Sequence, residues 1–141
     1  MKIGFIGLGT MGSRMASNLI KGGHALVIND MNQAAAQPLL DQGAVWADTP
    51  ALLAPQVDLV LMSLPGPAQV QEVLTGTNGL ASGLRAGSAI FDLSTNAPRS
   101  ITYPINTKSG MDKRVSLVIA PKVRCTIRLK TLLSNHGAVG S

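Results

Sequence analysis

Short apolar runs alternate with amphipathic segments from residue 1 to about residue 100. The runs that predict buried strands, because they are brief and apolar, are residues 2–7, 25–29, 44–47, 58–63 and 88–92. The segments that predict helices lie between them, at residues 10–21, 32–42, 49 onward and 65–75, with a further helix start at Ala97-Pro98. Such alternation is typical of βαβ units around a parallel sheet covered on both faces. Since crossovers are right-handed, we expect an α/β fold with a doubly wound parallel sheet.

Two of the predicted helices carry start signals that fix where they begin. Asn32 can cap the segment 32–42, and Pro38 inside that segment predicts a kink or a delayed start. Thr49 can cap the next helix, where Pro50 occupies the first helical position. We therefore expect short and interrupted helices between the second strand and the fourth.

Charge divides the chain near residue 100. Residues 1–100 hold five basic and six acidic side chains, whereas residues 101–141 hold seven basic side chains and one acidic one. The net charge is thus −1 before this point and +6 after it, and the apolar alternation ends there too. This shift predicts a folded domain over residues 1–101 and an irregular basic tail over residues 102–141, with one strand candidate at residues 115–120. A tail translated from a shifted reading frame would have this character.

Composition excludes several classes of protein. The single Cys125 cannot form an internal disulfide or a cysteine-based metal site, so we expect no metal. No stretch approaches the ~18 apolar residues of a membrane span, and no signal peptide opens the chain, which predicts a cytoplasmic protein without a membrane partner. Tyr103 is the only aromatic residue of the tail, so specific nucleic-acid binding is not expected.

One glycine-rich turn carries the clearest chemical signal. It follows the first predicted strand, opens the first predicted helix, and reads Gly7, Leu8, Gly9, Thr10, Met11, Gly12. In a dinucleotide-binding fingerprint, the first glycine permits a tight turn, the second lets the pyrophosphate approach, and the third lets the helix pack closely. The helix start supplies free amides for the phosphates. Asp30, 18 residues after the last glycine, is placed to accept hydrogen bonds from the adenosine ribose; the less favoured alternative is a turn-forming or capping residue.

Residues 5–19 resemble the signature of the β-hydroxyacid dehydrogenases. This family includes 3-hydroxyisobutyrate dehydrogenase and tartronate semialdehyde reductase, and it is related to 6-phosphogluconate dehydrogenase. Three later segments resemble the family in the same order: Asp30-Met31-Asn32 at its ribose turn, Ser63-Leu64-Pro65 at its adenine-side loop, and Asp92-Leu93-Ser94-Thr95 near its nicotinamide ribose. The resemblance covers residues 1–101. It implies NAD(P) binding by Gly7, Leu8, Gly9, Thr10, Met11, Gly12, Asp30, Met31, Leu64, Pro65 and Thr95.

The resemblance also implies a reaction, hydride transfer between the cofactor and a small 3-hydroxy acid, but it stops before the residues that would perform it. The family continues with a Ser-Gly-Gly substrate loop and a lysine in a G-x-x-K-x-x-x-N helix. Residues 110–113 match only the start of that motif, because Leu117 stands where the asparagine should be. We therefore expect a truncated cofactor half with no catalytic residue. A non-catalytic dinucleotide-binding module and a polyanion-binding basic tail remain as alternatives, and the substrate and oligomeric state stay open.

The end of the second strand predicts the choice of cofactor. Asp30 can accept a hydrogen bond from a ribose 2′-hydroxyl but repels a 2′-phosphate, and Met31 stands where NADP-preferring relatives carry arginine. This pair predicts NAD rather than NADP, unless a cation such as Arg14 folds in. Ser94 and Thr95 could donate hydroxyls to the cofactor or cap a helix, and Asp92 is expected to be structural.

Overall fold

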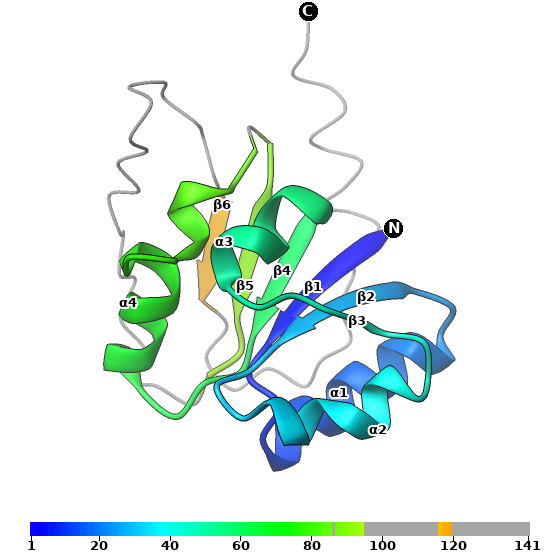
Figure 1. The fold of residues 1–141 in the computed structure, drawn as a ribbon. Helices are drawn as coiled ribbons and strands as arrows, with labels where there is room; N and C mark the ends of the chain where they lie inside the picture. The colour runs from blue at the N-terminus through cyan, green and yellow to red at the C-terminus, as the bar shows by residue number, and fades with distance from the viewer. Residues whose placement is uncertain (86, 95–115, 120–141) are drawn as a thin grey trace, which may run out of the picture.

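A six-stranded, fully parallel sheet forms the centre of the molecule (Figure 1). The computed structural model describes residues 1–85, 87–94 and the backbone of 116–119. The strands are β1 (Lys2–Ile6), β2 (Ala25–Asn29), β3 (Val45–Trp46), β4 (Leu59–Met62), β5 (Ala89–Asp92) and β6 (Ser116–Ile119). Their spatial order is β3-β2-β1-β4-β5-β6. This is the order of the doubly wound dinucleotide-binding fold, which confirms the predicted fold class.

Helices cover both faces of the sheet (Figure 1). The α-helices are α1 (Thr10–Lys21), α2 (Gln37–Leu40), α3 (Pro50–Leu53) and α4 (Pro67–Thr75), and the 3₁₀ helices are η1 (Gln33–Ala36), η2 (Ala54–Gln56) and η3 (Leu80–Ser82). Side chains from α1 and α2 are buried in one apolar cluster, and side chains from α3, α4 and η3 are buried in another. The two clusters form the two layers of core that a parallel sheet requires.

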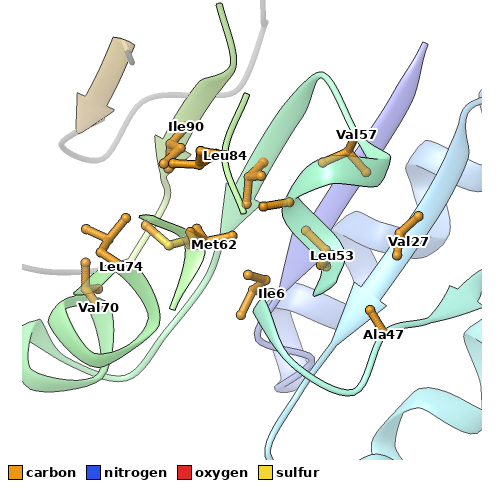
Figure 2. Close-up of a cluster of buried hydrophobic side chains, with 13 residues drawn as sticks. Ile6, Val27, Ala47, Leu53, Val57, Met62, Val70, Leu74, Leu84 and Ile90 are labelled. Carbon is orange, nitrogen blue, oxygen red and sulfur yellow. The ribbon is translucent and has the colours of Figure 1, made fainter. Parts of the chain in front are cut away.

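Alternate side chains of each central strand enter opposite clusters. In β1, Ile3 and Phe5 join the α1 side, whereas Ile6 joins the α3 and α4 side. Figure 2 shows the second cluster, in which Leu53 of α3 and Leu74 of α4 point toward the strands. Because successive strand side chains face opposite ways, an apolar run without polar alternation is what burial on both faces demands.

The helix signals read from the sequence are confirmed in detail. The Asn32 side chain accepts a hydrogen bond from the amide of Ala34, and the Thr49 side chain accepts one from the amide of Leu52. Pro38 lies at the start of α2, so the expected helix over 32–42 is divided into η1 and α2. The two short 3₁₀ helices η2 and η3 were not predicted.

The predicted strand at residues 115–120 is confirmed as β6, which pairs in parallel with β5. These four residues depart from the irregular tail that the charge pattern predicted. The predicted helix start at Ala97-Pro98 lies outside the described residues, as do Cys125 and Tyr103.

The carboxyl ends of four adjacent strands lie in one row. Asn29 pairs with Ile6, Ile6 with Met62, and Met62 with Asp92. The chain leaves β1 toward β2 on one side, and β4 lies on the other side of β1. The crevice outside β1 and β4 is therefore the topological switch point, where open parallel sheets bind their ligands.

Candidate functional site

The glycine turn begins at this switch point. Gly7 has φ of +96°, a left-handed conformation that side chains strongly disfavour. Its amide donates to the carbonyl of Asn29 at 3.1 Å, and a Cβ on Gly7 would collide with the carbonyl oxygen of Ser63. The turn thus lies against the ends of both β2 and β4, and only glycine fits its first position.

The other two glycines of the turn, Gly9 and Gly12, differ in how closely they are packed. A Cβ on Gly12 would collide with the Gly7 carbonyl oxygen, so Gly12 lets α1 lie directly on the turn. By contrast, a Cβ on Gly9 would meet no atom of the described residues within 4 Å. The packing therefore explains Gly12 but not Gly9, whose bare backbone faces open space.

The start of α1 is suited to bind an anion. Gly9 is its N-cap, no described side chain caps it, and its first turn holds no acidic residue. Thr10 and Met11 are exposed. Free amides and the positive end of the helix dipole attract phosphate. Because Gly9 has no side chain, a pyrophosphate could reach these amides without a steric clash.

Asp30 is fixed to the glycine turn by its carboxylate. Its Oδ2 accepts the amide of Leu8 at 2.6 Å, and its Oδ1 accepts the amide of Asn32 at 2.7 Å. We call these three residues the Asp30 corner. The half-buried carboxylate has about four acceptor sites, so these two bonds leave others for a ribose hydroxyl. The sequence placed Asp30 beside the turn but gave no signal for its bond to Leu8, 22 positions away.

No cation holds Asp30 in the described part of the chain. Met31 is fully exposed, and Arg14 is exposed on α1. The single ion pair found among residues 1–85 and 87–94 joins Arg85 to Asp58 at 3.3 Å, just before the start of β4. Asp58 lies at the amino-terminal ends of the strands, whereas Asp30 lies at their carboxyl ends. The Asp30 carboxylate therefore has no ion-pair partner among the described residues.

A second corner lies between β4 and β5. The amide of Leu64 donates to Ser94 Oγ at 2.8 Å, and the amide of Ser94 donates to Asp92 Oδ1 at 2.9 Å. Asp92 and Ser94 are buried. We call these three residues the Ser94 corner. Asp92 therefore has the expected structural role, while Ser94 holds the Leu64 loop, a role that the sequence did not reveal.

The expected adenine-side loop also reaches the glycine turn. A Cβ on Gly7 would lie 3.1 Å from Leu64 Cδ2, so Leu64 is a direct neighbour of the turn. Pro65 is exposed next to it. The structure thus brings the turn, Asp30 and Leu64 to one edge of the sheet. Thr95 lies outside the described residues.

The described residues contain no group of three or more histidine, cysteine, aspartate or glutamate side chains that could hold a metal ion. None of the helices among them has the length and apolar character needed to cross a bilayer.

Comparison with known families supports a dinucleotide site. Residues 2–110 match the family described as the NAD binding domain of 6-phosphogluconate dehydrogenase. The 3-sulfolactaldehyde reductase of Escherichia coli (strain K12) is 44% identical over 96 residues, which cover 68% of this chain and 32% of that protein. The 2-(hydroxymethyl)glutarate dehydrogenase of Eubacterium barkeri is 36% identical over 121 residues, or 86% of this chain and 40% of that protein. This second match extends past residue 101, where the domain boundary stays a prediction.

Solved structures of oxidoreductases share the fold of this chain. A 3-hydroxyisobutyrate dehydrogenase from Salmonella typhimurium has a TM-score of 0.63 at 32% identity, covering 69% of this chain and 34% of that one. Psf3 in complex with NADP+ and 2-OPP has a TM-score of 0.62 at 31% identity, covering 66% of this chain and 33% of that one. The chain spans about a third of the length of these proteins, apart from the Eubacterium barkeri enzyme, of which it spans 40%. With the glycine turn, the strand order and the family match in agreement, the chain belongs to the NAD-binding domain family of 6-phosphogluconate dehydrogenase, and its fold is that of nicotinamide-dependent oxidoreductases.

Proposed function

We propose that this chain is the cofactor-binding part of an oxidoreductase that transfers a hydride between NAD(H) and a small 3-hydroxy acid. The observation that carries the proposal is the open space over Gly9 between the glycine turn and the uncapped start of α1. Packing alone does not require glycine at this position, whereas close approach of a pyrophosphate does. The named relatives act on small hydroxy acids or the corresponding aldehydes, which supports the substrate class.

The residues present fit the dinucleotide from its phosphates to its adenosine ribose. The amides at the start of α1 would hold the pyrophosphate, and the remaining lone pairs of Asp30 would accept the ribose hydroxyls. When bound, the cofactor supplies the hydride chemistry, while the protein orients it and excludes competing contacts. Leu64 and Pro65 would border the cofactor on the β4 side, where Ser94 holds the loop that carries them.

Charge favours NAD(H) over NADP(H). A 2′-phosphate would bring about two negative charges beside the Asp30 carboxylate and could donate no hydrogen bond to it. Met31 offers no compensating charge, and Asp30 has no ion-pair partner among the described residues. Discrimination therefore comes from repulsion together with a lost hydrogen bond.

Binding of NADH to the full 141-residue chain tests this proposal. The midpoint of thermal unfolding should rise with NADH concentration, because a ligand that binds only the folded state stabilises it. Gly9→Ala should fold normally, since its methyl group meets no atom in the part of the chain that the structure describes, yet bind NADH more weakly because the methyl group would lie in the path of the phosphates. A chain that binds neither NADH nor NADPH, or a Gly9→Ala variant that binds as tightly as the wild type, would overturn the proposal.

A further inference from the structure

We infer that Asp30 is a positioning residue for the phosphate site as well as a partner of the ribose. Its carboxylate joins two segments, because one oxygen holds Leu8 inside the glycine turn and the other holds Asn32 after β2. A group that only bound ribose would leave the turn to be held by other contacts. Here the same side chain shapes the turn, so recognition of ribose and of phosphate are coupled.

The turn needs an acceptor at this point. β1 ends at Ile6, so the Leu8 amide has no strand partner, and the Leu8 side chain is buried. Leu8 lies between Gly7, which has a positive φ, and Gly9, whose backbone is extended. A buried amide without an acceptor is costly, and a bond to a carboxylate is stronger than one to a neutral group.

Two consecutive amides of the turn are bound by two consecutive residues of β2's end. Gly7 donates to the carbonyl of Asn29, and Leu8 donates to Asp30. Asn29 is itself buried, and its Nδ2 donates to the carbonyl of Ala47 at 2.8 Å. The end of β2 is thus anchored to the segment after β3 and carries the turn with it. Removing the Asp30 carboxylate releases one of the two bonds and leaves the Leu8 amide unpaired.

This inference rests on the proposed function for its ligand, and it makes a distinct prediction about ligands that lack ribose hydroxyls. If Asp30 acted only on the ribose, Asp30→Ala would bind 2′,3′-dideoxy-ADP as well as the wild type does. If it also positions the turn, Asp30→Ala should bind both ADP and 2′,3′-dideoxy-ADP more weakly, by about tenfold for the dideoxy compound. Removal of a negative charge near the phosphates would act in the opposite direction, so weakening cannot be a charge effect.

Isothermal titration of the full chain with both nucleotides measures this difference. Asp41→Asn is the matched control, because it removes one exposed carboxylate whose Oδ1 accepts, within the described part of the chain, only from Gln37 at 2.9 Å. The control should bind both nucleotides like the wild type. Equal or tighter binding of 2′,3′-dideoxy-ADP by Asp30→Ala would overturn the positioning role.

Amide hydrogen exchange of the free chain separates this inference from the proposed function. The Leu8 amide should exchange about tenfold faster in Asp30→Ala than in the wild type, and remain unchanged in Asp41→Asn. If Asp30→Ala fails to fold, Asp30→Asn retains one acceptor oxygen and should give a smaller increase. Unchanged Leu8 exchange in a folded variant contradicts the inference even if NADH binds. Faster exchange in a chain that binds no nucleotide would support the positioning of the turn and refute the proposed function.

Discussion

The Asp30 corner and the Ser94 corner are built alike but differ in charge. In each, the amide two residues after a strand donates to a side chain that follows the neighbouring strand, Leu8 to Asp30 and Leu64 to Ser94. The first acceptor is a half-buried carboxylate, and the second is a buried hydroxyl. The hydroxyl can hold a loop without imposing charge on a ligand, whereas the carboxylate does both. We therefore expect the first corner to discriminate between the cofactors and the second corner only to position its loop.

The largest expected effect concerns catalysis, which neither the Asp30 corner nor the Ser94 corner supplies. Purified full chain should show no NAD-dependent oxidation of 3-hydroxyisobutyrate, because the substrate loop and lysine helix of the family have no counterpart in the sequence. General acid–base catalysis alone contributes about 10²–10⁴-fold, and substrate positioning adds to it. The measurement is NADH absorbance at high protein concentration in material free of host dehydrogenases. Steady turnover would show that a proton-transfer group is present after all.

Two glycines of the turn should differ strongly in how much stability the same substitution costs. Gly12→Ala should lower the free energy of unfolding by about 1–3 kcal/mol or more, because its methyl group meets the backbone of Gly7. Gly9→Ala should change it by no more than about 0.5 kcal/mol, because none of the described residues lies within 4 Å of its methyl group. Urea unfolding of both variants checks this contrast. Equal stability losses would mean that the turn is packed differently from the structure.

The Ser94 corner should affect stability without affecting cofactor choice. Ser94→Ala leaves the Leu64 amide without its acceptor, which should cost about 1–3 kcal/mol of stability. The ratio of NADH to NADPH affinity should remain that of the wild type. Ser17→Ala is the control, since the one hydrogen bond of its hydroxyl among the described residues goes to the exposed Gln42 side chain. A changed ratio of NADH to NADPH affinity in Ser94→Ala would contradict the expectation that the Ser94 corner only positions its loop.

The smallest expected effect sharpens the role of charge at the Asp30 corner. Met31→Arg adds a cation at a fully exposed position and leaves the bond from Leu8 to Asp30 in place. An exposed ion pair is worth about 0.2–1 kcal/mol, so NADPH affinity should rise by up to about fivefold while NADH affinity changes little. Titration of both cofactors measures it. An unchanged NADPH affinity would mean that residue 31 does not face the 2′-position.

The sequence predicts the framework of this site better than its internal bonds. Apolar runs, caps and glycines are local signals, and they located β1, the turn, α1 and Asp30 because each depends on neighbouring residues. The bonds from Leu8 to Asp30 and from Leu64 to Ser94 join positions 22 and 30 residues apart. They depend on the register of parallel strands, which no local pattern encodes. For the same reason, the pairing of β6 with β5 could not be read from its apolar run.

The most direct test of the account is the affinity ratio of the full chain for NADH and NADPH by titration calorimetry. Absolute affinities should be modest, because the chain spans about a third of the length of most of the relatives named above. The ratio should nevertheless be preserved, because Asp30 and the glycine turn, the groups expected to contact the ribose and the phosphates, both belong to this chain. A lost hydrogen bond and charge repulsion together predict that NADH binds at least about tenfold more tightly. Equal affinities, or tighter binding of NADPH, would contradict the role assigned to the Asp30 carboxylate.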